Sequence, residues 1–147
     1  MHPKKRLSRV AAISRSEEDT MSAEEKRNLD AARRWTHLYN TDPDRCCDEM
    51  LTDDCEVLMP ARNVHDKGGR EGYRLAVRTN LEALPDRRQR VLSPAADGDR
   101  VFVEMVWEGT SSGVHAQFGP EGSPFRLHCI SLLRFVEGCI ASETVFV

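Results

Sequence analysis

Apolar residues recur at helical spacing in the first half of the chain and predict three helices. Ser22 and Glu25 form a capping box, in which each side chain bonds the other residue's backbone N–H, so the first helix is expected over residues 23–40. An Asp-Pro pair, which suits the start of a helix, opens a second helix over residues 43–51. A third helix is predicted over residues 70–84, where a proline follows.

The apolar pattern changes to strict alternation in the second half of the chain, which is typical of strands. Strands are predicted over residues 55–59, 88–93, 101–108, 125–136 and 140–147, with a further strand left open near residues 114–118. Residues 60–69 are expected to form a loop. Three helices followed by a run of antiparallel strands exclude a doubly wound parallel sheet. The order favours an α+β fold, with three N-terminal helices packed on one face of a strongly curved antiparallel sheet.

The last two predicted strands are apolar on both faces. Leu127 and Cys129 are expected on one face of the strand, and Ile130 and Leu132 on the opposite face. A strand that is apolar on both faces is covered on both faces. Because the helices cover only one face, we expect a homodimer through the outer face of the sheet.

Length and charge fit one domain after a basic tail. The chain has 147 residues and a net charge of −3, which gives no bias toward nucleic acid. No apolar run reaches the roughly 18 residues of a membrane-spanning helix, so we expect no membrane partner. Residues 1–20 hold five basic and three acidic side chains, and we expect a disordered or extended basic tail over residues 1–21 and one domain over residues 22–147. The basic run Arg87–Arg90 is expected to be a solvated edge strand.

Cysteine usage bears on the compartment. The five cysteines are an odd number and contain no C-x-x-C pair. This pattern favours reduced thiols in a cytoplasmic protein over a disulfide framework. No metal site is expected.

Five short segments carry a resemblance to a known superfamily: Asp42–Asp44, Thr52–Asp54, Gly69–Glu71, Val103–Trp107 and Ile130–Phe135. With the order of elements over residues 22–147, they resemble the nuclear transport factor 2-like superfamily. That superfamily includes SnoaL-type polyketide cyclases, ketosteroid isomerases, scytalone dehydratase and limonene epoxide hydrolase. The resemblance implies a cone-shaped α+β barrel of cystatin-like topology around an apolar pocket, and chemistry that needs no cofactor. Folds of this kind host many functions.

The catalytic residues of these relatives are missing from the matched positions. Met59 stands before Pro60, where ketosteroid isomerases carry the carboxylate that moves the proton. Trp35 occupies the place of their first-helix tyrosine. Ser131 occupies the place of an aspartate that both isomerases and SnoaL-type cyclases use. Neither a methionine nor an unassisted serine transfers protons well near neutral pH.

A different carboxylate, Glu143, is the candidate acid or base. It is in phase with Val145 in the last predicted strand, so it is expected to point into the apolar cavity, where burial raises the pKa of a carboxyl. Ser131 is its expected hydrogen-bonding neighbour. Tyr39 is a candidate helper, because Tyr39-Asn40 resembles the Tyr-Asp at the end of the first helix of scytalone dehydratase. A structural salt bridge of Glu143, or a one-residue slip that turns it outward, stays open.

Apolar side chains on the same face of the strands, the third helix and the matched positions make up the expected pocket wall. These residues are Trp35, Met59, Val77, Val101, Val103, Met105, Trp107, Leu127 and Cys129.

Two functions remain open at this point. The first is a cofactor-independent isomerase, cyclase, dehydratase or epoxide hydrolase that acts on a hydrophobic, ring-bearing small molecule by proton transfer. The second is a non-catalytic ligand-binding or dimerisation module with the same fold. The missing aspartate favours the module, and the buried carboxyl candidate favours the enzyme.

Overall fold

The computed structural model describes residues 20–147. The tail predicted over residues 1–21 lies outside this range, except for Thr20 and Met21. The helices are α2 (Ala23–Thr41), α3 (Pro43–Met50) and α4 (Gly69–Ala83), and two short 3-10 turns are η1 (Pro60–Arg62) and η2 (Ala116–Phe118). The strands are β1 (Leu51–Met59), β2 (Val64–Asp66), β3 (Arg88–Asp97), β4 (Arg100–Thr110), β5 (Pro124–Val136) and β6 (Cys139–Phe146). The predicted α+β fold class is confirmed.

The capping signals in the sequence act as expected. Ser22 Oγ accepts a hydrogen bond from the Glu25 backbone N–H at 3.1 Å, and Glu25 Oε1 accepts one from the Ser22 N–H at 3.0 Å. Asp42 ends α2 and also caps α3, where its side chain accepts from the Arg45 N–H at 3.2 Å. These bonds satisfy N–H groups that the first helical turns leave without partners.

The six strands form one sheet in the order β2-β1-β6-β5-β4-β3. The sheet is mixed and not wholly antiparallel, because β1 pairs with β6 in parallel. The chain runs from β1 through α4 to the far edge of the sheet and returns strand by strand until β6 lies beside β1. Two local expectations also change: the predicted loop after Met59 contains β2, and the region near residues 114–118 forms η2 and not a strand.

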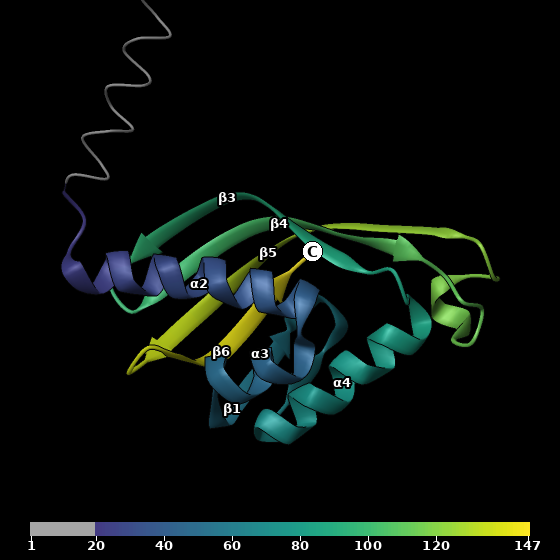
Figure 1. Cartoon of the computed structure of the whole chain (residues 1–147), viewed down its shortest axis with the longest axis horizontal. Coiled ribbons are helices and arrows are strands. Elements are labelled where there is room, and N and C mark those ends of the chain that lie inside the picture. The colour runs from purple at the N-terminus through teal and green to yellow at the C-terminus, as the bar shows by residue number, and fades with distance from the viewer. Residues whose placement is uncertain (1–19) are drawn as a thin grey trace, which may run out of the picture.

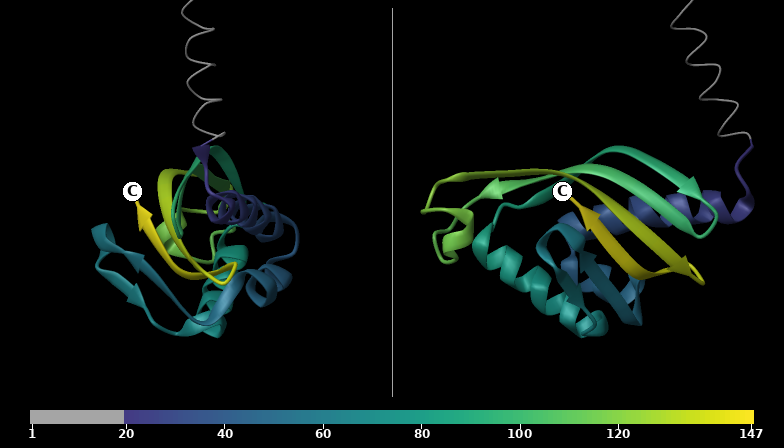
Figure 2. Two further views of the ribbon diagram at one scale, coloured as in Figure 1. Left: turned by 90° about the vertical axis from the view of Figure 1, so that its left-hand side faces the viewer. Right: turned by 180° about the vertical axis from the view of Figure 1, so that it is seen from behind.

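The sheet curves around the helices. In Figure 1, strands β3 and β4 arch above α2, while α4 and β1 lie below it. The turned views in Figure 2 show the same curvature from the side and from behind. The core lies between the helices and the concave face, and its largest fully buried side chains include Trp35, Leu51, Leu84, Met105, Leu133 and Ile140.

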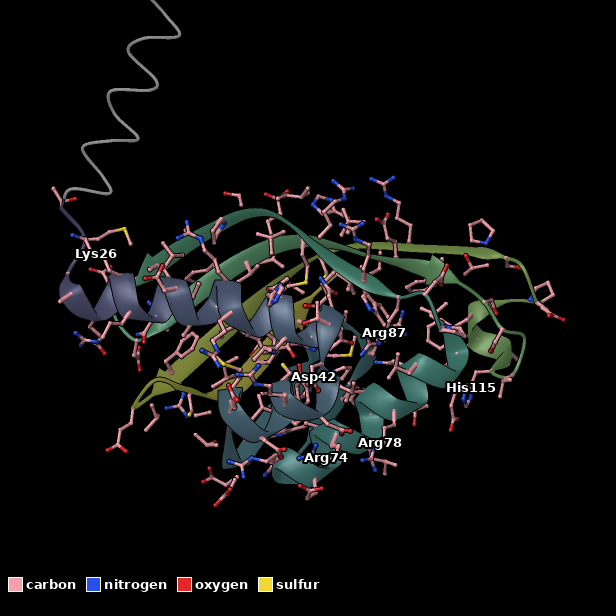
Figure 3. The ribbon with its side chains drawn as sticks, viewed as in Figure 1. Lys26, Asp42, Arg74, Arg78, Arg87 and His115 are labelled. Carbon is pink, nitrogen blue, oxygen red and sulfur yellow. The ribbon has the colours of Figure 1, made fainter. Side chains whose placement is uncertain are left out.

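Two features fix α4, which forms one wall of the site described below. Gly69 has φ +68°, and a Cβ at this position would lie 2.3 Å from the Asp53 carbonyl oxygen. The first residue of α4 therefore occupies a backbone position that only glycine fits. Arg74 bonds Asp44 and Asp48 of α3 as well as Glu71 (Figure 3). These contacts hold α4 against α3 and β1.

Candidate functional site

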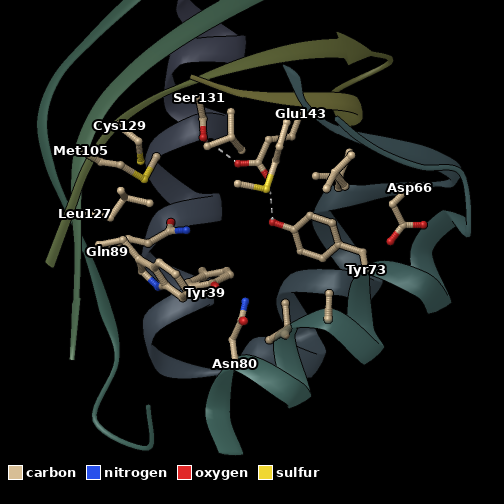
Figure 4. Close-up of a pocket in the computed structure, with 17 residues that line it drawn as sticks. Tyr39, Asp66, Tyr73, Asn80, Gln89, Met105, Leu127, Cys129, Ser131 and Glu143 are labelled. Carbon is tan, nitrogen blue, oxygen red and sulfur yellow. Dashed lines mark hydrogen bonds between the residues drawn. The ribbon is translucent and has the colours of Figure 1, made fainter. Parts of the chain in front are cut away.

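A pocket of about 280 Å³ opens between α4, the end of α2 and the concave face of the sheet (Figure 4). Its volume is near the lower end for small-molecule sites. The lining comes from both helices and all six strands and consists of Tyr39, Val57, Met59, Val64, Asp66, Tyr73, Ala76, Val77, Asn80, Gln89, Met105, Trp107, Leu127, Cys129, Ser131, Glu143 and Val145.

Glu143 lies in the wall of this pocket and is only 7% exposed. It is not on a frayed strand end, because its neighbours in the sheet are Leu133 on one side and Val57 on the other. Within residues 20–147 no ion pair involves Glu143. The two alternatives that the sequence left open, a salt bridge and an outward-facing side chain, are therefore not what the structure has.

Two hydroxyl groups hold the Glu143 carboxyl. Ser131 Oγ lies 2.7 Å from Glu143 Oε2, and the Tyr73 hydroxyl lies 3.2 Å from Oε1. Burial raises the pKa of Glu143 above its ordinary value, while hydrogen bonds from Ser131 and Tyr73 act in the opposite direction by stabilising the carboxylate. Burial is the larger effect, so the carboxyl holds its proton to a higher pH than an exposed glutamate does.

Sequence reasoning missed Tyr73 as a polar partner. It lies on the apolar side of α4, is 8% exposed, and has a pKa well above its ordinary value because it is buried. The signal was present, since a buried tyrosine in an apolar stripe brings a hydroxyl that needs a hydrogen-bond partner.

Tyr39 lies in the pocket wall but does not bond Glu143. Burial raises the pKa of the Tyr39 phenol to about 12, against the opposing effects of the Arg87 charge and a hydrogen bond with Asn80. The Arg87 guanidinium lies over the Tyr39 ring, 4.3 Å from its centroid. In Figure 4, Tyr39, Asn80 and Gln89 lie on the side of the pocket away from Ser131 and Glu143.

The basic run Arg87–Arg90 is not wholly solvated, which corrects the prediction. Arg87 and Gln89 are 5% and 8% exposed, whereas Arg88 between them is exposed. The strand alternates, and its inner face is covered by the end of α2, where Asn40 bonds the backbone of Gln89. Gln89 therefore joins the pocket wall.

Most but not all of the expected wall residues face the pocket. Met59, Val77, Met105, Trp107, Leu127 and Cys129 line it. Trp35, Val101 and Val103 do not: they are at most 1% exposed and belong to the solid core. The reason is that α2 packs on β3 and β4 and fills the sheet's concave face at that end, so this pocket opens near α4.

The described part of the chain was searched for two further features, a cluster of metal-ligating side chains and a reactive thiol. Within residues 20–147, no group of three or more His, Cys, Asp or Glu side chains is arranged to hold a metal ion. Burial raises the pKa of the Cys129 thiol to about 11, so it stays protonated at neutral pH. The same residues contain no helix that is long and apolar enough to cross a membrane.

A family model of the SnoaL-like polyketide cyclases matches residues 29–147. The chain belongs to the SnoaL-like polyketide cyclase family. No curated protein sequence gives a significant match to this SnoaL-like chain.

Solved structures share its fold. A candidate SnoaL-like polyketide cyclase from Jannaschia sp. CCS1 is 18% identical with a TM-score of 0.75, and the match covers 86% of this chain and 88% of that one. IdmH, a candidate polyketide cyclase from Streptomyces antibioticus, is 20% identical with a TM-score of 0.70 over 81% of this chain and 90% of its own. A protein with a ketosteroid isomerase-like fold from Catenulispora acidiphila is 19% identical with a TM-score of 0.66, covering 80% and 84%. At these identities the likeness concerns the fold.

Proposed function

We propose that this SnoaL-like protein is a cofactor-independent enzyme that transfers a proton on a hydrophobic, ring-bearing small molecule, with Glu143 as the acid and base. The observation that carries the proposal is a buried carboxyl in a pocket wall, bonded by the hydroxyls of Ser131 and Tyr73 and paired with no cation within residues 20–147. A carboxyl whose pKa is raised toward neutrality suits both donation and removal of a proton.

The proposed step needs no additional reactant. Glu143 gives its proton to a carbonyl oxygen of the ligand, and the carboxylate that remains takes a proton from a carbon next to that carbonyl. The ligand becomes its enol, and the carboxyl is regenerated. An enol of this kind leads to isomerisation or to an intramolecular cyclisation, and the family of the chain favours cyclisation. Ser131 and Tyr73 stabilise the carboxylate while the proton is away.

A non-catalytic binding module is the second candidate. Two observations favour it: Met59 and Ser131 stand at the positions where the resemblance implies catalytic carboxylates. Such a module would keep the apolar pocket and bind a ligand without changing it.

Exchange of hydrogen for deuterium tests the chemistry before the natural substrate is known. Cyclic ketones such as 1-tetralone would be incubated with the protein in D2O, and deuterium at the carbon next to the carbonyl would be followed by NMR. We expect the wild type to accelerate exchange and E143Q to lose about 100-fold or more of that acceleration. Calorimetry provides the control, since E143Q should still bind the ketone. Binding without any exchange by the wild type would support the module.

A further inference from the structure

Asp66 is a carboxylate of the pocket wall that the proposed proton transfer does not use. It ends β2 and is only partly buried. Its Oδ1 atom accepts a hydrogen bond from the Gly68 N–H at 2.7 Å. Its Oδ2 atom has no hydrogen-bond partner among residues 20–147, and it is not one of the buried polar atoms that the fold leaves without a partner. One oxygen of Asp66 is therefore held in place, and the other is open to a ligand.

The register of the sheet places Asp66 and Glu143 on one wall of the pocket. Asp66 of β2 and Glu143 of β6 both pair with Val57 of β1, which lies between them. Residues that pair in this way share a face of the sheet, and neighbouring strands lie about 4.8 Å apart. The Cα atoms of Asp66 and Glu143 are therefore about 10 Å apart. All three residues line the pocket, so a small ring system can lie over Val57 with one end near each carboxyl group.

The start of α4 fixes the Asp66 side chain. A Cβ at Gly68 would lie 3.0 Å from Asp66 Oδ1, and a Cβ at Gly72 would lie 3.3 Å from the same atom. Because neither glycine has a side chain, the carboxylate packs closely against the first turn of the helix. In Figure 4, Asp66 lies on the same side of the pocket as Tyr73 of α4. A side chain that is already held in this way loses little conformational entropy when it binds a ligand.

The charge of the pocket lining has one sign. Asp66 and Glu143 are its acidic residues, and no Lys, Arg or His of the described chain lines it. Among residues 20–147, no ion pair involves Asp66. The wall also contains three aromatic residues, Tyr39, Tyr73 and Trp107, and the faces of aromatic rings attract cations. A carboxylate without a cationic partner, in a pocket with aromatic walls, favours a positively charged ligand.

We propose that Asp66 determines the charge of the ligand, because its carboxylate binds a protonated amine at the open side of the pocket. Val64, two residues before Asp66, also lines the pocket and is 41% exposed, so this side is in contact with solvent. An ammonium group donates up to three hydrogen bonds, and one to Oδ2 of Asp66 is a charge-assisted bond. A ligand that carries a carboxylate is repelled by the same group. The inference goes beyond the proposed function, since it concerns binding and does not depend on proton transfer by Glu143.

Three ligands with one ring system test the proposal: 2-aminoindane, 2-indanol and indane-2-carboxylate. Calorimetry at neutral pH and constant ionic strength should show that the wild type binds the amine about tenfold more tightly than the alcohol, and the carboxylate more weakly than the alcohol. D66N keeps an oxygen for the Gly68 N–H and removes the charge. In D66N the amine should lose about tenfold in affinity, while the alcohol is unchanged. D54N is the matched control, because Asp54 is an exposed acid of β1 that does not line the pocket. Thermal melting checks that D66N folds.

Several results would overturn the role of Asp66. They are equal affinities for the three ligands, a preference for the amine that persists in D66N, and no binding of the amine at roughly millimolar concentration. The same titrations in E143Q separate this inference from the proposed function. E143Q should keep the preference for the amine, because burial raises the pKa of Glu143 and favours its neutral form. If that preference survives in E143Q and the wild type catalyses no exchange, the role of Asp66 is supported and the enzyme is rejected. A preference that is lost in E143Q and kept in D66N would place the cation at Glu143 instead.

Discussion

Ser131 Oγ of β5 lies 2.7 Å from Glu143 Oε2 of the neighbouring strand β6. The resemblance implies an acid or base aspartate at the position of Ser131, and in this chain the carboxyl reaches the same part of the pocket from the adjacent strand. Ser131 pairs with Val145 in the sheet, so Glu143 is its diagonal neighbour on the same face. A short serine at one position leaves room for a longer glutamate from the other.

The first prediction concerns stability and pH. Burial raises the pKa of Glu143 in the folded state above the ordinary 4.5. The folded protein therefore keeps a proton that the unfolded chain releases as pH rises above that value. The stabilising contribution of the neutral carboxyl is complete below pH 4.5 and is lost as pH rises through the folded pKa.

The glutamine side chain of E143Q does not ionise, so it stays neutral at every pH of the series. We expect its free energy of unfolding, relative to the wild type, to increase with pH above 4.5, by at most about 1.4 kcal/mol per pH unit. Urea denaturation of both proteins at a series of pH values measures the difference. A difference that is constant across the series would contradict the raised pKa of Glu143.

The second prediction concerns the two hydroxyl partners of Glu143. Both donate to the carboxylate and lower its pKa, so S131A and Y73F should each raise the pKa of Glu143 further. NMR titration of the Glu143 side-chain carbonyl carbon measures this shift. S142A is the matched control, because Ser142 precedes Glu143 in β6 and forms no bond to its carboxyl. An unchanged titration in S131A and Y73F would show that these hydroxyls do not stabilise the carboxylate.

The third prediction compares two glycines with positive φ. In G69A the new methyl group meets the Asp53 carbonyl oxygen at 2.3 Å, whereas Gly98, with φ +60°, has nothing within 4 Å of its would-be Cβ. We expect G69A to lower the free energy of unfolding by about 3 kcal/mol or more and G98A by about 1 kcal/mol. Urea midpoints at constant m-value measure both. Equal losses would mean that the close approach at Gly69 relaxes without cost.

Periodicity in the sequence predicted which face of a strand looks inward, but not how deep the space behind it is. Alternation in β4 correctly places Val101, Val103, Met105 and Trp107 on one face. Only the last two reach the pocket, because α2 covers the others. How much of β4 is covered depends on how α2 packs across the sheet. A local pattern of apolar residues does not predict that packing.

The polar half of the site was harder to foresee for the same reason. Tyr73 lies in an apolar helical stripe and Gln89 in a basic run, and both patterns favour simpler interpretations than a pocket wall. Their roles depend on partners far along the chain: Glu143 for Tyr73, and Asn40 for Gln89. The parallel pairing of β1 with β6 is equally non-local.

The last prediction concerns the outer face of the sheet, where we expect two copies of the chain to meet. Ile130 and Phe146 are sheet neighbours on this face and are 42% and 46% exposed. Exposed apolar pairs on a sheet face that α2, α3 and α4 leave uncovered favour association. Sedimentation velocity should show a dimer for the wild type and a monomer for I130K. L75K is the control, because Leu75 of α4 is 67% exposed but lies away from the sheet face. A wild type that remains monomeric, or an I130K variant that still dimerises, would contradict this interface.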